Sequence, residues 1–100
     1  MSKVIAVSEK IYDGTKAKEI VIANGNDIRI QSVGEGIYEL AGKLAPEAEY
    51  RPIGLVKLGD LSKQTKALDD NIYASDVSGL YSITVQNVAD VEAIYVSIME

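Results

Sequence analysis

The sequence contains no cysteine, histidine, tryptophan or phenylalanine. Without cysteine the chain forms neither disulfides nor thiolate metal sites, and nothing points to an oxidising compartment. The absence of histidine and cysteine also removes the commonest general base and the commonest strong nucleophile. We therefore expect a protein that is not an enzyme and that holds no metal or other cofactor.

Carboxylate pairs are the groups left for acid–base chemistry or calcium binding. The candidates are Asp69-Asp70 and the pair formed by Glu47 and Glu49. Adjacent carboxylates on a strand face opposite ways, and the residues around both pairs do not follow the Asp-x-Asp-x-Asp-Gly calcium loop. We interpret both pairs as solvated loop charges.

The charge balance is acidic, with 10 basic and 15 acidic residues and a formal charge of −5. Affinity for nucleic acid comes from clustered lysine and arginine, whereas the lysines here have acidic neighbours and the arginines are Arg29 and Arg51 alone. No apolar run approaches the roughly 20 residues that span a bilayer, and the apolar run within Met1–Ser8 is too short for a signal-peptide core. We expect synthesis in the cytoplasm and neither a nucleic-acid nor a membrane partner.

A length of 100 residues corresponds to one domain, which we place at residues 1–100. Apolar and polar residues alternate along much of the chain, as in antiparallel strands with one solvated face. The expected strands are Lys3–Ser8, Lys18–Ala23, Ile28–Val33, Ile37–Leu40, Arg51–Leu58, Ile72-Tyr73, Leu80–Gln86 and Glu92–Met99. The pattern predicts an all-β fold: a single antiparallel β-sandwich, jelly-roll or immunoglobulin-like, with at most one short helix.

Turn residues separate these strands. Asn24–Asp27 contains Asn-Gly, the strongest short hairpin signal, and predicts that the strands on either side pair. Asn87–Asp90 predicts a final hairpin in the same way. Asp and Gly make Ile11–Gly14 a turn, because both tolerate unusual backbone angles.

Three segments leave alternatives open. Gly42–Tyr50 fits a loop between sheets better than a helical turn, and Asp60–Asp70 fits a short helix, a polar loop or a short strand. Pro52 has no backbone N–H, so it must begin its strand or lie at a sheet edge.

Five of the six tyrosines follow isoleucine or leucine. In a strand, such a pair puts one side chain into the core and the other on the outer face or rim. Exposed tyrosines grouped around a groove would favour a carbohydrate platform, and scattered or buried ones would count against it. Tyrosine is also enriched in subunit interfaces.

We expect the surface that attaches to a partner to lie along the first and last strands, because they carry alternating apolar residues and little protective charge. The candidate interface residues are Tyr73, Tyr81, Tyr95, Val96 and Ile98, and the same strands carry Val4, Ile5 and Ile94.

The chain from Gly36 onward also shows a recognisable order of features. These are Ile37–Leu40, Gly42–Leu44, Tyr50–Ile53, and Ile72-Tyr73 followed by Asp76-Val77-Ser78-Gly79. This order resembles capsid-decoration, head-fibre and related virion accessory proteins of tailed bacteriophages. Asn71 departs from the pattern, because a glycine commonly precedes the aromatic strand there.

The resemblance implies a virion component without catalytic residues that attaches to capsid or tail proteins, often as a homo-oligomer. The expected function is a capsid decoration or head-fibre base protein that stabilises the capsid surface, made in the host cytoplasm and located in the virion. The alternatives are a carbohydrate or cell-surface binding module, with a glycan as partner, and a tail or baseplate component.

Overall fold

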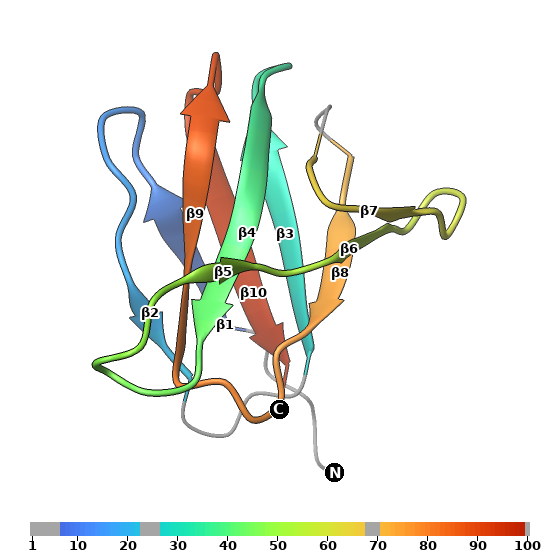
Figure 1. Ribbon diagram of the computed structural model, residues 1–100. Helices are drawn as coiled ribbons and strands as arrows, with labels where there is room; N and C mark the ends of the chain where they lie inside the picture. Colours follow the sequence, from blue (N-terminus) through green and yellow to red (C-terminus); the bar gives the residue numbers. More distant parts are fainter. Residues whose placement is uncertain (1–6, 23–26, 68–70, 100) are drawn as a thin grey trace, which may run out of the picture.

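The computed structural model describes residues 7–22, 27–67 and 71–99, which form ten strands (Figure 1). The strands are β1 (Val7–Tyr12), β2 (Ile20–Val21), β3 (Asp27–Val33), β4 (Ile37–Lys43), β5 (Arg51–Pro52), β6 (Leu55–Lys57), β7 (Lys63–Gln64), β8 (Tyr73–Asp76), β9 (Ser82–Ala89) and β10 (Ala93–Met99). In the described part of the chain, no helix could cross a membrane.

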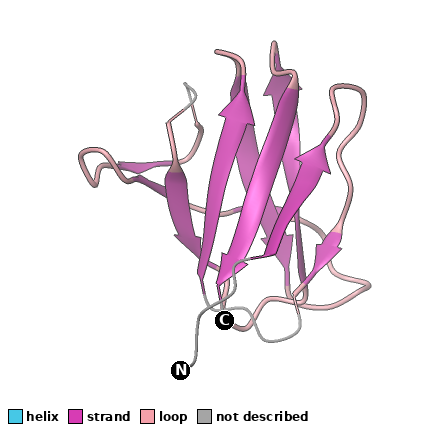
Figure 2. Cartoon of the chain, turned by 180° about the vertical axis from the view of Figure 1, so that it is seen from behind, coloured by secondary structure: helices cyan, strands magenta, loops and turns pink. Residues whose placement is uncertain are grey.

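The strands form two antiparallel sheets. The order is β1-β10-β3-β8-β6-β7 in the six-stranded sheet and β2-β9-β4-β5 in the four-stranded sheet. Figures 1 and 2 show the sheets from opposite sides, one layered over the other. The predicted all-β sandwich is confirmed.

The pairing between strands is nested. β1 pairs with β10, β2 with β9, β3 with β8, and β4 with β5, so the two halves of the chain pair from the ends inward. A ribbon of paired strands wrapped in this way is a jelly roll, which decides between the two predicted sandwich types. The β6–β7 hairpin extends the six-stranded sheet beyond β8.

The two predicted hairpins are wrong. β2 and β3 belong to different sheets, as do β9 and β10, so neither pair of consecutive strands is hydrogen-bonded as a hairpin. Residues 24–26 of the first turn lie outside the described residues. After β9, the chain crosses between the sheets and buries Val91 on the way. A turn signal predicts that the chain reverses, but burial of the next apolar residue decides which sheet it joins.

The boundaries of several strands also differ from the prediction, most clearly for β1. Ile11 is fully buried within β1, so the first turn begins only at Asp13. Of the expected strand Lys3–Ser8, residues 3–6 lie outside the described residues.

The expected strand Arg51–Leu58 is divided. Its first part is β5 in the four-stranded sheet, and its second part is β6 in the six-stranded sheet, because the chain crosses between them at Ile53 and Gly54. Pro52 lies in the edge strand β5, as its missing donor requires. Of the predicted loop Gly42–Tyr50, residues 44–50 form a loop, whereas Gly42 and Lys43 belong to β4.

The segment Asp60–Asp70 is not helical in its described part. Residues 60–67 contain the short strand β7 and a single bridge from Ala67 to Tyr38 in β4. Residues 68–70 lie outside the described residues. This segment therefore runs from the six-stranded sheet back to the four-stranded one.

The core lies between the sheets and consists mainly of aliphatic side chains that alternate along the strands. Its largest fully buried residues are Tyr38, Tyr73, Ile11, Ile28, Ile30, Leu40, Leu55, Ile83 and Ile94. With no phenylalanine or tryptophan in the sequence, tyrosine supplies the aromatic volume of this core.

Gly36 lies where the β3–β4 turn packs against the turn after β9. A β-carbon at Gly36 would overlap the carbonyl oxygen of Ala89 and stand 2.5 Å from that of Asp90. We expect Gly36→Ala to lower the free energy of unfolding by about 2 kcal/mol, because the backbone around it must move. Gly54→Ala is the matched control, since nothing lies within 4 Å of its added carbon. Equal urea midpoints for the two variants would contradict this packing.

Candidate functional site

The predicted interface residues fall into two groups. Tyr73 is 0% exposed and Val96 is 1% exposed, so both pack in the core of their own chain and are not available to a partner. Their assignment to an interface is therefore wrong. Successive side chains of a strand point to opposite faces, and Val96 shares the inward face of β10 with Ile94. β10 is also a central strand, flanked by β1 and β3, and not an edge.

The remaining candidates reach the surface. Tyr95 is 42% exposed and points outward from β10, whereas Tyr81 and Ile98 are half-buried. β1, which pairs only with β10 in the sheet order, is the edge strand that the sequence predicted. Val4 and Ile5 lie outside the described residues.

Tyr95 is the centre of an outward surface on the six-stranded sheet, which we call the Tyr95 face. It consists of Ser8, Lys10, Arg29, Gln31, Ile72, Tyr95 and Ser97. The strand register builds it: Tyr95 stands between Lys10 and Gln31, and Ser97 in the next row stands between Ser8 and Arg29.

A shallow groove of about 200 Å³ runs along this face. The exposed side chains of Ile72 and Tyr95 provide its apolar surface, and Arg29 provides a cation. The Lys10 ammonium lies 5.6 Å from the centre of the Tyr95 ring, within reach of a cation–π contact. Tyrosine and arginine on an open surface are typical of protein interfaces.

The tyrosines do not group around this groove. Tyr38 and Tyr73 are in the core, and Tyr50 lies on the four-stranded sheet beside Ser82. By the criterion above, this scatter counts against a carbohydrate platform.

A second polar cluster lies on the outer side of the four-stranded sheet. Glu19 Oε2 accepts hydrogen bonds from Ser82 Oγ at 2.6 Å and from Tyr50 Oη at 2.7 Å. The Lys43 ammonium stands 3.3 Å from the same oxygen and 4.6 Å from the centre of the Tyr50 ring. We call these four side chains the Glu19 cluster.

Hydrogen bonds from Ser82, Tyr50 and Lys43 lower the pKa of Glu19 to about 2. The carboxylate is therefore charged at neutral pH and accepts a hydrogen bond from the Ser82 hydroxyl. Because Lys43 and Tyr50 stand at the two ends of the 44–50 loop, the cluster fixes that loop against the sheet. Sequence analysis missed this cluster, since its members are far apart in the chain and no local pattern links them.

Three turns repeat one local arrangement that the sequence does display. Asp13, Asp60 and Asp76 each accept a hydrogen bond from the hydroxyl two residues later, at 2.7, 2.7 and 2.6 Å. Those bonds lower the pKa of each aspartate. The Asp76-Val77-Ser78-Gly79 motif is thus a turn held by its own side chains.

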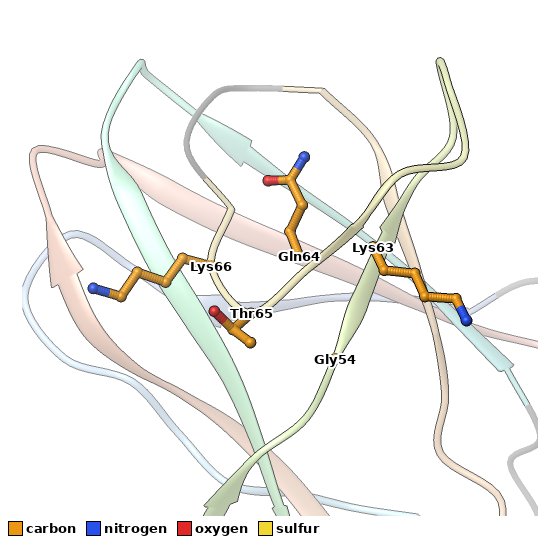
Figure 3. A pocket seen from close by; sticks show the side chains of 5 residues that line it. All are labelled: Gly54, Lys63, Gln64, Thr65 and Lys66. Carbon is orange, nitrogen blue, oxygen red and sulfur yellow. The ribbon is translucent and has the colours of Figure 1, made fainter.

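A further cavity, of about 560 Å³, is an open hollow beside β7 (Figure 3). It is lined by Gly54 and residues 63–66. The Lys63 and Lys66 side chains extend to opposite sides in Figure 3, so they do not converge on a common ligand. Among the described residues, no three carboxylates or other metal-binding side chains gather to hold an ion.

No protein-family model and no curated protein matches the sequence. Solved structures do match. The SPBc2 prophage-derived protein YomS is 13% identical with a TM-score of 0.81, and the match covers 100% of this chain and 97% of YomS.

The PBSX exported protein XepA is 12% identical with a TM-score of 0.84, and the match covers 100% of this chain but 39% of XepA. At these identities, the likeness to both proteins shows a shared fold.

Glu19→Gln tests the electrostatic part of the Glu19 cluster. A pKa lowered from 4.5 to about 2 stabilises the fold fully above about pH 4.5, and this contribution is lost as the pH falls toward 2. The difference in unfolding free energy between the natural chain and the variant should therefore shrink across that window in urea titrations. Glu35→Gln, which removes an exposed carboxylate outside the cluster, is the control for the loss of a surface charge. A difference for Glu19→Gln that stays constant with pH would contradict the role of the charge.

Proposed function

We propose that this chain is a non-enzymatic structural protein of a phage or prophage, attached to the virion as a capsid decoration or head-fibre base protein. The observation that carries the proposal is the match with the prophage-derived YomS, which extends over 97% of that protein. The shared unit is thus nearly the whole of YomS, not a module within it. The order of features that resembles virion accessory proteins supports the same reading.

The Tyr95 face supplies the attachment surface in this proposal. It lies on the strands of the larger sheet, so its side chains are held in register by β1, β10 and β3. Binding to a preformed lattice needs little rearrangement of such a face, and a protein that binds only the assembled state stabilises it by mass action. No bond is made or broken in this role.

The second candidate is a phage protein that acts away from the capsid surface, as a tail or baseplate component or outside the particle. XepA, which shares the fold, is named as an exported protein, and this name supports a role away from the capsid surface. A glycan-binding role has less support, because the tyrosines are scattered.

Quantitative mass spectrometry of purified particles from the source tests the proposal. A decoration protein should occur at a simple ratio to the major capsid protein. A copy number equal to that of a tail ring or fibre would identify the protein as a tail component instead. Its absence from particles, with the protein recovered in the medium, would reject a virion role.

Tyr95→Glu tests the attachment face. Because Tyr95 is 42% exposed, the variant should keep the unfolding midpoint of the natural chain. Its binding to purified particles should weaken by about tenfold or more, as for a central aromatic residue of an interface. Val21→Glu is the matched control, an exposed apolar residue on the other sheet. Equal loss of binding in both variants would argue against the Tyr95 face.

A further inference from the structure

The tip of the β6–β7 hairpin exposes two leucines. Leu58 is 40% exposed and Leu61 is 69% exposed. Figure 1 shows this hairpin extending sideways from the sandwich, at the far right of the view. We call the two side chains the leucine tip.

Hydrogen bonds within the turn connect the residues of the tip. Leu61 has a φ of 61°, a backbone region that disfavours leucine. Its amide donates to the Lys57 carbonyl at 2.6 Å, and Asp60 accepts from the amide and the hydroxyl of Ser62 at 3.0 and 2.7 Å. Strained backbone positions cluster at functional sites, and here the strained residue presents a large apolar side chain to solvent.

An apolar pocket of about 410 Å³ lies beside β5 and the loop before it. Its apolar lining comes from Gly42, Leu44, Ala48, Pro52, Ile53 and Leu80, and we call it the Leu80 pocket. Because Gly42 has no side chain, Ile53 and Leu80 pack close to its backbone. A β-carbon there would stand 2.6 Å from Ile53 Cδ1 and 2.8 Å from Leu80 Cδ1. Its volume is within the usual range for pockets that enclose a ligand group.

The leucine tip cannot reach the Leu80 pocket of its own chain. Both views place the β4–β5 loop on one side of the molecule and the β6–β7 tip on the other. A contact between them therefore requires two molecules.

One pair of charges at the two elements is of opposite sign, and the tip also carries Asp60, whose carboxylate is bound by Ser62 of its own turn. Lys63 is exposed beside the tip, and Glu47 is exposed in the loop that forms one wall of the pocket. Neither has an ion-pair partner within the described residues. The other charges at the pocket are already paired, Lys43 with Glu19 at 3.3 Å and Arg51 with Glu49 at 3.4 Å.

We propose that the leucine tip of one chain docks into the Leu80 pocket of a second copy, with Lys63 facing Glu47. Because tip and pocket are different surfaces, the contact is head-to-tail, and repeating it gives a closed ring or an open filament. It does not use the Tyr95 face, so it stands or falls independently of the proposed attachment.

Two variants test the contact. Leu61→Asn removes the leucine and suits the left-handed backbone, so the fold should be as stable as before or more so. Ala48→Trp fills the pocket from an exposed loop position. In sedimentation velocity, the natural chain should form oligomers and each variant alone should be a monomer.

An equimolar mixture of the two variants decides the geometry. The Leu61→Asn chain still has an open pocket and the Ala48→Trp chain still has its tip, so the mixture should form a 1:1 heterodimer and nothing larger. A mixture that stays monomeric would overturn the head-to-tail contact, as would a natural chain that is monomeric at about 1 mM. Variants that associate as strongly as the natural chain would overturn it too.

A charge exchange keeps the test independent of any folding defect. Lys63→Glu and Glu47→Lys should each weaken self-association, and the double variant should restore it. Additive weakening in the double variant would show that the two residues do not face each other, and would overturn the proposed docking.

Discussion

The nested pairing of strands is the constraint on which the rest of the structure depends. Because β1 pairs with β10 and β2 with β9, each sheet combines strands from both ends of the sequence. Register along these pairs decides which side chains enter the core. It places Ile94 and Val96 inside and leaves Tyr95 between Lys10 and Gln31 outside. The outer surface of the larger sheet is therefore a product of long-range pairing.

Local pattern predicted the fold class and several strands, because alternation and turn chemistry depend on neighbours in the sequence. It did not predict which strands pair, because Asn-Gly predicts that the chain reverses but does not determine which sheet the next strand joins. It also did not orient the tyrosines. The dipeptides Ile72-Tyr73 and Ile94-Tyr95 have the same composition, yet the first buries its tyrosine and the second its isoleucine. Only the register with the neighbouring strands distinguishes them.

The same limit applies to the polar side chains. The aspartate turns can be read from the sequence, because donor and acceptor are two residues apart, whereas the Glu19 cluster unites positions from 19 to 82. That cluster has a second effect on the surface. By fixing both ends of the 44–50 loop, it holds one wall of the Leu80 pocket in place before any partner arrives, which reduces the entropy lost on binding.

The pairing of β1 with β10 also bears on synthesis. During synthesis β1 and β2 emerge well before their partners β10 and β9, so neither sheet can be completed until those later strands have emerged. Folding must then close loops that span most of the described residues, and such topologies fold slowly. In the meantime the apolar strands of the first half are open to other nascent chains. This protein should consequently depend on chaperones more than a helical domain of equal length.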